Sequence, residues 1–493
     1  MQVIRYRTHY EVKDYIIGSN MKFERYLSKW VMYRKRGGFS GAGYYEPVGF
    51  VYDDKNRILR FPAGVSYWTV EKYLMEKVIF DTDHDPFDNI PIRSFGEPKD
   101  DIQRMMIRFL LGEEEYADNK NHSMLCCNAQ TGQGKTFASI VMMAYYKCKT
   151  AIIVHTKELA LSWITELTKY TDIDEKRILV LDADTMVKIM DGKIDPDKYY
   201  VFIVLHQSIN SFVKRYEEMT WEVVTDLFLK LRVGLKVIDE TNMMFHNIIL
   251  LDTHTNIFKN IYLTATMKRS DEEENKVFQR CFYSVPKFDP VKLGKNVGKK
   301  HIRMIVIEYN SHPSIGEKMM CKRRGMFDVK KYADYLVNAD GMFFEILNDV
   351  VYKFAVKNEF RTLILCAKIS SCDIIADWLK EVYPDKKIGV FNSSISKDEK
   401  ERVKKECDII VSIIKSLGVG VNLPGLRAVI NTEAFRFDGL GDQSSGRLRK
   451  WTEDTESWYI ELVNIGFENI RSQYHQRMKL YQTLFKSINI IKV

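Results

Sequence analysis

The stretch CCNAQTGQGKTFAS, residues 126–139, decides the fold of the chain. The β-rich apolar run MLCCNA leads into it, and the helical run FASIVMMAYY follows it. Between the two lies a glycine-rich loop that ends in Lys135 and Thr136. A strand, a glycine-rich turn and a helix, in that order, point backbone N–H groups and a helix N-terminus at an anion. The stretch therefore predicts a phosphate-binding loop.

The residue types of this loop predict ATP and Mg²⁺ as its ligands. Lys135 would reach the β- and γ-phosphates, and the Thr136 hydroxyl would ligate the metal ion. Ala129 stands where the first glycine of such a loop is usual. The residues expected to bind ATP here are Thr131, Gly132, Gln133, Gly134, Lys135 and Thr136.

A second acidic centre follows about a hundred residues later. The run LKVIDETN, residues 235–242, places two carboxylates directly after an apolar strand. Phosphoryl transfer to water needs one group that holds the metal and one that orients or deprotonates the attacking water. We expect Asp239 to be the metal-side acid and Glu240 to be the base.

From residue 101 onward, short β-rich apolar runs alternate with helical stretches. The first series reads MLCCNA, AIIVHT, RILVL, VFIVLH, LKVID and NIYLTAT. After a break near residues 285–300, the second series reads RMIVIEY, TLILCA, KIGVFN, IIVSI, AVINT and SWYIEL. Such alternation predicts parallel sheets covered by helices on both faces. Two series predict two α/β domains, within the two or three domains expected for 493 residues at roughly 150 residues each.

Composition narrows the class of protein. Lys and Arg number 74 against 66 Asp and Glu, and this mild excess is compatible with a polyanionic partner without demonstrating one. The 8 cysteines include no Cys-x-x-Cys pair, which argues against structural zinc, and we expect all of them to be reduced core thiols. No apolar run reaches membrane-spanning length, so we expect a cytoplasmic protein with no membrane partner.

Alanine at the first loop position, followed by Thr131-Gly132, resembles motif I of superfamily 2 helicases. LTATMKRS (263–270) resembles motif III, IIVHTKELALSW (152–163) motif Ia and LHQSI (205–209) motif Ib. SLGVGVNLPGL (416–426) resembles motif V, and DQSSGRLRK (442–450) resembles motif VI. The likeness runs from about residue 100 to residue 480. It implies an ATP-dependent enzyme with two tandem RecA-like parallel-sheet domains that clamp one ATP between them.

The resemblance also assigns roles to individual residues. Gln103 falls where these enzymes read the adenine, while Thr264 and Thr266 of motif III would couple hydrolysis to movement. Gly420 and Gln443 would belong to the ATP site. The residues that would contact nucleic acid within the motor are Thr156, Lys157, Gln207, Ser208, Ser393, Ser416 and Asn422.

Two positions depart from the family pattern. Asn242 ends the DETN form of motif II, where the family has another residue that links the motifs, so coupling is in doubt while hydrolysis should survive. In motif VI, Arg447 matches the first arginine, but the second falls on Lys450, with Arg449 one place early. Lysine is a poor substitute for a bidentate guanidinium, so either Arg449 reaches the γ-phosphate or Arg447 serves alone, and we favour Arg449.

The N-terminal segment has a pattern of expected strands, turns and helices that differs from the alternation of the motor region. GYYEPVGFVYDDKNRILRFPAGVSYWTVEKYL (43–74) resembles the small substrate-binding domain of UvsW-type helicases of bacteriophages, which remodel branched DNA. The neighbouring basic turn Arg34-Lys35-Arg36, flanked by aromatic residues, either grips DNA phosphates or is a solvated loop. The α+β unit 1–80 would be the DNA-binding domain.

The expected domain organisation is the N-terminal domain 1–80, a linker 81–100, a first motor domain 101–287, a linker 288–299, a second motor domain 300–480 and a C-terminal helix within 467–493. The function expected from these parts is unwinding or branch migration of forks, Holliday junctions, and D- or R-loops in phage replication, recombination and repair. The expected partners are branched or partly single-stranded DNA, with RNA left open, and single-strand-binding or recombination proteins. The enzyme is expected to be a monomer. An RNA helicase, a double-strand DNA translocase without unwinding, and an ATP-gated clamp with little turnover stay open.

Overall fold

The computed structural model describes residues 1–35, 44–47, 50–81, 89–129, 132–216, 221–241, 245–265, 267, 272–290, 299–413, 423–433, 448 and 456–493. The chain divides into two compact units, Met1–Lys295 and Asn296–Val493. Within the described ranges, no helix combines the length and the apolar character that crossing a membrane requires.

The first unit is built on a seven-stranded sheet in which every neighbouring pair of strands is parallel. Most of its strands are buried along their whole length, which explains why they read as continuous apolar runs rather than as alternating ones. In spatial order the strands are β10 (Ile178–Leu181), β11 (Val201–Leu205), β9 (Thr150–Val154), β12 (Leu235–Ile238), β13 (Lys259–Thr264), β8 (Met124–Asn128) and β14 (Lys287–Phe288).

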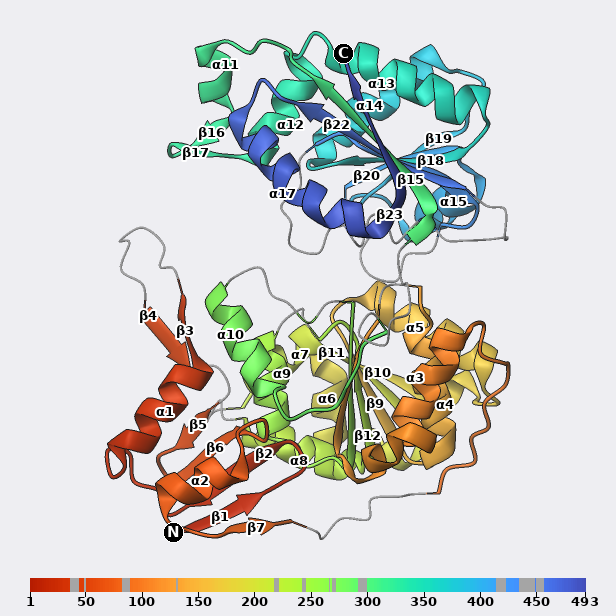
Figure 1. The fold of residues 1–493 in the computed structure, drawn as a ribbon. Helices are drawn as coiled ribbons and strands as arrows, with labels where there is room; N and C mark the ends of the chain where they lie inside the picture. Colours follow the sequence, from red (N-terminus) through yellow and green to blue (C-terminus); the bar gives the residue numbers. More distant parts are fainter. Residues whose placement is uncertain are drawn as a thin grey trace. The chain divides into compact units, whose positions relative to one another are not determined.

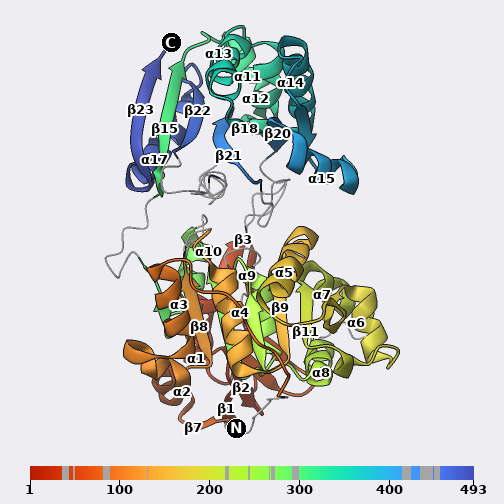
Figure 2. The same ribbon diagram turned by 90° about the vertical axis from the view of Figure 1, so that its right-hand side faces the viewer.

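Helices cover both faces of this sheet (Figures 1 and 2). On one face lie α3 (Asp101–Leu111), α4 (Lys135–Tyr146) and α5 (Lys157–Tyr170). On the other lie α6 (Ala183–Met190), α7 (His206–Val213), α8 (Glu222–Leu231), α9 (Phe245–Thr253) and α10 (Glu272–Cys281). Short 3-10 turns occur at Glu114–Asn121, Glu175–Arg177 and Pro196–Lys198.

The N-terminal segment forms a smaller mixed sheet beside the second of these faces (Figure 1). Its strands pair antiparallel except for the last, which is parallel to the first. In spatial order they are β5 (Val51–Asp53), β6 (Ile58–Pro62), β2 (His9–Lys13), β1 (Gln2–Arg5) and β7 (Val78–Phe80). Two helices, α1 (Met21–Val31) and α2 (Tyr67–Leu74), and a two-stranded ribbon, β3 (Met32–Lys35) with β4 (Tyr44–Pro47), complete it.

The N-terminal sheet and the first motor domain share one hydrophobic core. Tyr10 and Phe61 of the small sheet belong to the same buried cluster as Phe245 and Phe278 of α9 and α10. Polar contacts reinforce the junction, since the Thr8 hydroxyl donates to the Asp252 carbonyl at 2.7 Å. The segment expected to be an independent domain is therefore packed into the motor domain that follows it.

The described part of the expected linker 81–100 is also packed against the motor domain. Ile90 and Ile92 are buried, and the N–H of Phe95 donates to the Tyr170 carbonyl at 2.7 Å. The proline- and aspartate-rich composition had suggested a free connection. From residue 89 onward, the alternating isoleucines instead attach this stretch to the first motor domain.

The second unit has a seven-stranded sheet that is likewise parallel throughout. Its strands, in spatial order, are β19 (Ile388–Phe391), β20 (Ile409–Ile413), β18 (Arg361–Cys366), β21 (Leu426–Asn431), β22 (Ser457–Asn464), β15 (Lys299–Tyr309) and β23 (Phe485–Lys492). The helical segments are α11 (Ile315–Met320), α12 (Val329–Asn338), α13 (Phe343–Val351) with a π-turn at Tyr352–Lys357, α14 (Ile369–Val382), α15 (Lys397–Glu406) and α17 (Glu468–Leu484). A short hairpin, β16 (Lys322–Arg323) with β17 (Met326–Phe327), follows α11.

The C-terminal prediction was wrong in part. Helix α17 ends at Leu484, and the rest of the expected helix is β23, which pairs parallel with β15 and extends the sheet at its edge. The β-branched run at Ile488, Ile490 and Ile491 favours a strand over a helix. The apolar side chains of α17 pack into the core of the second unit, and they are Ile470, Tyr474, Met478 and Tyr481, followed by Phe485 at the start of β23.

The predicted fold class is confirmed: two parallel-sheet RecA-like domains with a small N-terminal α+β part. In the sequence, the boundary between the two compact units falls between Lys295 and Asn296, inside the expected connection 288–299. Phe288 of β14 still belongs to the first sheet. All eight cysteines are buried and free, as expected for core thiols.

The junction between the N-terminal sheet and the first motor domain yields a stability prediction. Arg60 on β6 donates to Glu11 of β2 at 3.0 Å and also pairs with Glu222 of α8, and its side chain is only 11% exposed. Arg60→Ala leaves the 9%-exposed Glu11 carboxylate without this cation, which should cost about 3 kcal/mol of unfolding free energy. Denaturant unfolding of the full-length chain measures it.

Arg104→Ala is the matched control, because Arg104 pairs with Asp101 at 2.7 Å on the surface, where both side chains are more than half exposed. It should change the unfolding free energy by no more than about 0.5 kcal/mol. Equal effects of the two substitutions would contradict the shared-core description.

Candidate nucleotide site

Three of the predicted catalytic residues, Lys135, Asp239 and Glu240, lie at one edge of the first sheet. In a parallel sheet all strands end at the same edge, so the residues that directly follow them are neighbours in space. The phosphate loop follows β8, Asp239 follows β12 and Thr264 ends β13. In the strand register Asn128, which lies just before the phosphate loop, is beside Thr264. Ile238, which lies just before Asp239, is beside Ile153.

The phosphate loop has the backbone that its glycines predict. Gly132 and Gly134 have φ of 86° and 83°, a region that residues with side chains rarely adopt. A Cβ on Gly134 would also lie only 1.8 Å from the amide nitrogen of Gln103. Ala129, in contrast, is not among the positive-φ residues, and this explains why alanine can replace the usual first glycine.

Lys135 is buried and closes the loop on itself. It is the first residue of α4, and its Nζ donates to the Ala129 carbonyl at 2.7 Å. Binding of a phosphate by this ammonium would therefore exchange a carbonyl acceptor for a charged one. Because charge-assisted hydrogen bonds are stronger than neutral ones, the exchange favours the anion.

Gln103 contacts the phosphate loop directly. Its side-chain amide donates to the Gly134 carbonyl at 3.1 Å and accepts from the Lys99 N–H at 2.8 Å. Asp100 caps the same helix by accepting from the Gln103 N–H. Gln103 thus joins α3 to the loop, and its reading of adenine stays a prediction.

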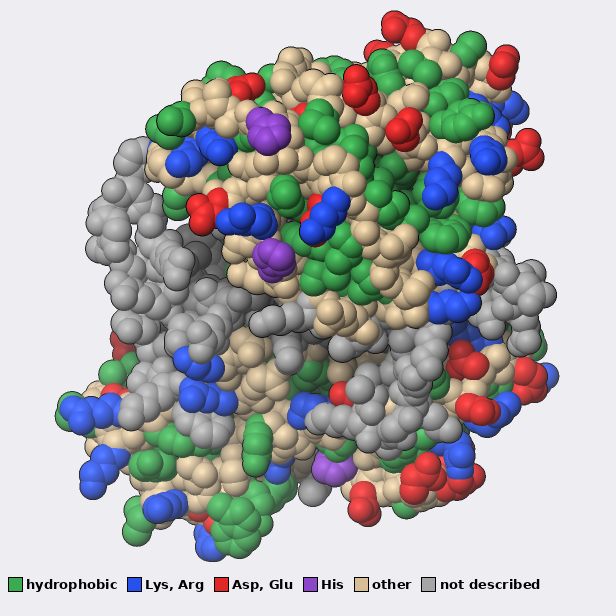
Figure 3. Space-filling model, turned by 45° about the horizontal axis from the view of Figure 1, so that its top comes forward, with side chains coloured by type: hydrophobic (Ala, Val, Ile, Leu, Met, Phe, Trp, Pro, Cys, Tyr) green, Lys and Arg blue, Asp and Glu red, His purple; other side chains and the backbone are tan. Residues whose placement is uncertain are grey.

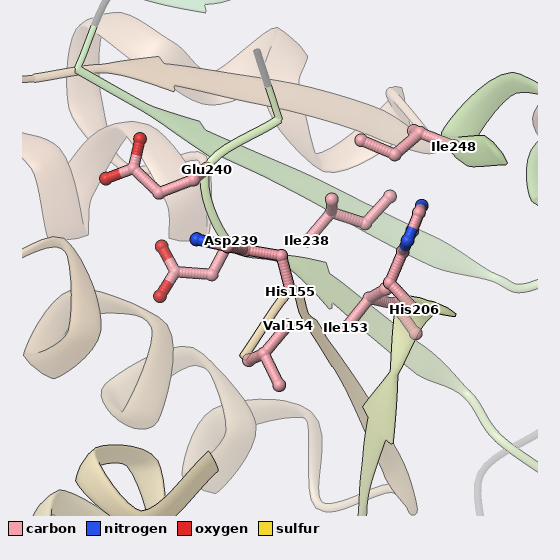
Figure 4. Close-up of a pocket in the computed structure, with 8 residues that line it drawn as sticks. All are labelled: Ile153, Val154, His155, His206, Ile238, Asp239, Glu240 and Ile248. Carbon is pink, nitrogen blue, oxygen red and sulfur yellow. The ribbon is translucent and has the colours of Figure 1, made fainter. Parts of the chain in front are cut away.

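The two motif II carboxylates point to the same side of the strand end (Figure 4). Asp239 is partly exposed, whereas Glu240 is 3% exposed and adopts a φ of 55°. A non-glycine residue in that region is uncommon and often marks a functional position. Both line a small hollow whose walls are Ile153, Val154, His155, His206, Ile238, Asp239, Glu240 and Ile248.

Trp163 is a residue that sequence reasoning missed. It lies on α5, is 1% exposed, and its indole N–H donates to Asp239 Oδ2 at 2.9 Å. A buried hydrogen bond of this kind holds one carboxylate oxygen in place and leaves the other to act as a ligand. In the sequence, Trp163 looks like any core aromatic residue, and no spacing rule connects it to Asp239.

His155 takes the place of a residue that is usually proline in motif Ia, and it is half-buried beside Asp239. Burial lowers the pKa of its imidazole, while Asp239 and Glu158 oppose that shift. The ring is therefore neutral near neutral pH and does not cancel the charge of Asp239.

Backbone hydrogen bonds connect the three motifs of this edge. The Ala129 N–H of the phosphate loop donates to the Thr264 carbonyl at 3.0 Å. Thr241, directly after the acid pair, donates through its N–H to the Leu263 carbonyl at 2.8 Å. A displacement of motif II would be transmitted to motif III through these bonds, and from there to the loop.

The residues predicted to contact nucleic acid lie at neighbouring strand ends. Thr156 caps α5 by accepting from the Leu159 N–H at 3.2 Å, and Lys157 is exposed beside it. Gln207 is exposed at the start of α7, after β11, and Ser208 is partly buried. In the second unit, Ser393 is exposed after β19.

Several predicted residues lie outside the part of the chain that the structure describes, and their roles stay predictions. Arg34 and Lys35 lie on β3, but only their backbone is described. The residues outside the described ranges are Arg36, Thr131, Asn242, Thr266, Ser416, Gly420, Asn422, Gln443, Arg447, Arg449 and Lys450. The described residues contain no cluster of three or more His, Cys, Asp or Glu side chains that could hold a metal ion alone.

Two family models match the chain in the regions just described. Residues 98–269 match the res subunit of type III restriction enzymes, and residues 343–478 match the helicase conserved C-terminal domain. The chain is an ATP-dependent helicase of superfamily 2. Comparison with curated protein sequences gives no significant match.

Solved structures share the fold of this helicase. Dbp5 of S. cerevisiae, bound to RNA and ADP BeF3, superposes with a TM-score of 0.53 at 12% identity, over 81% of this chain and 90% of Dbp5. Mss116p, bound to single-stranded RNA and AMP-PNP, gives 0.53 at 16% identity, over 80% of this chain and 74% of Mss116p. T4 UvsW aligns over the full length of both chains at 13% identity, but the TM-score is 0.35, too low to support an argument.

The Trp163 contact predicts how the site uses its metal. Trp163→Phe keeps a ring in the core but removes the donor to Asp239 Oδ2. We expect the Mg²⁺ concentration that half-saturates ATP turnover to rise about tenfold or more, as is typical when a supporting hydrogen bond to a metal ligand is lost. Titration of ATPase activity with Mg²⁺ measures this.

Trp458→Phe is the control, because Trp458 on β22 packs beside Phe354 in the other unit. It repeats the loss of an indole without touching the acid pair. An unchanged Mg²⁺ requirement in Trp163→Phe, with only a lower melting temperature, would show that Trp163 merely fills the core.

Proposed function

We propose that this helicase hydrolyses ATP at the carboxyl edge of its first sheet and uses the cycle to unwind or branch-migrate branched DNA. The observation that carries the proposal is the grouping of three sets of residues at the carboxyl ends of strands in one sheet, where only β13 separates β8 from the neighbouring strands β12, β9 and β11. The phosphate loop follows β8, the acid pair follows β12, and the predicted nucleic-acid residues follow β9 and β11. Nucleotide and nucleic acid would thus be handled by neighbouring strand ends.

In this proposal the residues of the edge divide the chemistry between them. Lys135 would turn from the Ala129 carbonyl to the γ-phosphate and stabilise the charge that develops there. Glu240, buried and held at a strained backbone angle, would orient the attacking water and accept its proton. Gln103 would keep the loop in place through Gly134.

The oxygen donors present fit Mg²⁺. Asp239 offers a carboxylate whose second oxygen is held by Trp163, and Thr136 offers a hydroxyl in the first turn of α4. Hard oxygen ligands from one carboxylate and one hydroxyl, with phosphate oxygens and waters, are typical for this ion. Bound there, Mg²⁺ would neutralise phosphate charge, and the role of the protein would be to hold the ion in position.

The choice of DNA over RNA rests on the N-terminal part of the chain. In sequence, residues 43–74 resemble the small substrate-binding domain of UvsW-type enzymes. The N-terminal sheet is built into the motor domain. A substrate-binding element so attached would move as one body with the strand ends that contact nucleic acid. Such an arrangement suits a motor that holds a duplex arm while displacing a strand.

A comparison of substrates tests this function. ATP turnover should be stimulated more by forked DNA and Holliday junctions than by single strands, and least by RNA. In every case Lys135→Ala should lower turnover by about a hundredfold or more, because the charge contact to the transition state is lost. Steady-state ATPase assays with each nucleic acid provide the measurement.

The control is Lys380→Ala, which removes an exposed lysine paired with Asp377 in the other unit and should behave as wild type. Stimulation by RNA alone would replace the DNA assignment with an RNA helicase. Turnover that no nucleic acid stimulates would contradict a motor of either kind.

A further inference from the structure

The hairpin β16–β17 is a surface feature that none of the helicase motifs includes. It lies between α11 and α12, outside the seven-stranded sheet of the second unit, at the rim of that unit (Figure 1). Its sequence, CKRRGMFD, residues 321–328, places three consecutive cations at the turn. The space-filling view shows Lys and Arg side chains interspersed with hydrophobic ones on the second unit (Figure 3).

Charge is strongly one-sided around this hairpin. Residues 317–331 contain six cations and two carboxylates. Each carboxylate accepts a backbone hydrogen bond at the N-terminus of a helix. Glu317 accepts from the Ser314 N–H at 2.7 Å in a capping box, and Asp328 accepts from the Lys330 N–H at 2.9 Å. The six cations, all at least partly exposed, are Lys318, Lys322, Arg323, Arg324, Lys330 and Lys331.

On α15, a solvated helix of the same unit, cations form ion pairs with carboxylates of the same helix. On α15, Arg402 pairs with Glu399 at 2.6 Å and Lys404 pairs with Glu401 at 2.7 Å. Within the described part of the chain, neither Lys322 nor Arg323 forms an ion pair of this kind. Lys322 and Arg323 therefore present positive charge that no carboxylate among the described residues pairs with, and such charge attracts a polyanion.

The turn fixes the direction in which the charges point. Lys322 pairs with Phe327, and Arg323 pairs with Met326. Arg324 and Gly325, the two residues between the strands, have φ of 52° and 79°, as a type I′ turn requires. Asparagine or glycine is usual at the first of these positions, and here an arginine occupies it, so the turn itself carries a cation.

The base of the hairpin is anchored in the core. Cys321 is fully buried, and its carbonyl accepts from the Asp328 N–H at 2.9 Å. The ring of Phe327 lies 5.5 Å from that of Tyr332 on α12. With both ends of the hairpin fixed, less conformational entropy is lost when the cations bind a ligand.

Apolar side chains are exposed among the cations. Met326, at the end of the turn, is 72% exposed, and Met319 and Met320 of α11 are more than half exposed. Flexible thioethers next to cations suit a ligand that combines phosphates with flat apolar faces. Nucleic acid has both, and methionine is among the side chains that insert against base steps.

We propose that this hairpin, with the adjoining ends of α11 and α12, is a nucleic-acid backbone site outside the helicase motifs. Lys322, Arg323 and Arg324 contact consecutive phosphates without reading sequence, and Met326 lies against an exposed base. The proposal rests on the proposed function for the presence of a nucleic-acid substrate. It adds a contact through which the second unit holds the nucleic-acid strand on which the motor acts.

Salt dependence of binding tests the site. The triple variant Lys322→Gln, Arg323→Gln, Arg324→Gln should bind labelled single-stranded DNA, duplex DNA and RNA more weakly than wild type. Each lost phosphate contact should reduce the slope of log affinity against log salt by about 0.7 to 0.9, or by about 2 to 3 in total for three cations. Fluorescence anisotropy at several salt concentrations gives the slope, and thermal unfolding verifies the fold.

The control removes the same charge from the same unit through Lys400→Gln, Arg402→Gln and Lys404→Gln on α15, and its slope should stay that of wild type. Met326→Ala should lower the rate of fork unwinding about threefold or more while leaving the salt slope unchanged. A wild-type slope in the hairpin variant, or an equal loss in the α15 variant, overturns the site. Failure of the proposed function is distinct, since wild type itself would then show no ATP turnover stimulated by nucleic acid.

Discussion

The parallel pairing of β8 with β13 determines where the predicted nucleotide site of this helicase lies. Because Asn128 lies beside Thr264, the phosphate loop begins next to motif III, and the Ala129 N–H donates to the Thr264 carbonyl. Pairing of β13 with β12 then brings the acid pair to the same edge. A shift of one residue in this register would move every buried side chain to the opposite face of the sheet, against different helices, so the position of the site is as strongly constrained as the packing of the core.

The second constraint is the core shared by the N-terminal sheet and the first motor domain. Tyr10 and Phe61 are as deeply buried as the motor strands, and Arg60 reaches from β6 to α8. Substrate binding by this part of the chain would therefore act directly on the helices of the first motor domain that pack against it, which include α8, α9 and α10. Deleting residues 1–80 would expose apolar surface of the motor domain, which is why point substitutions are the sounder test of its function.

Much of this arrangement follows from the sequence. Apolar runs and glycines predicted the strands, the phosphate loop and the order of the motifs, since parallel strands buried on both faces are continuous in pattern. The Trp163 contact with Asp239 could not be predicted, because it joins a helix to a strand end across 76 residues. The edge strand β23 was missed because it directly continues a helix, and the shared core was missed because composition suggested a free linker.

The most direct test of the account is the behaviour of Glu240→Gln in the presence of ATP and forked DNA. The substitution keeps the size of the buried side chain and removes its basicity, while Lys135 and Asp239 still hold the nucleotide. We predict ATP binding close to that of wild type, hydrolysis slowed by about a hundredfold or more, and DNA retained for as long as ATP is bound. Wild-type hydrolysis by this variant would contradict the assignment of the acid pair and with it the location of the site.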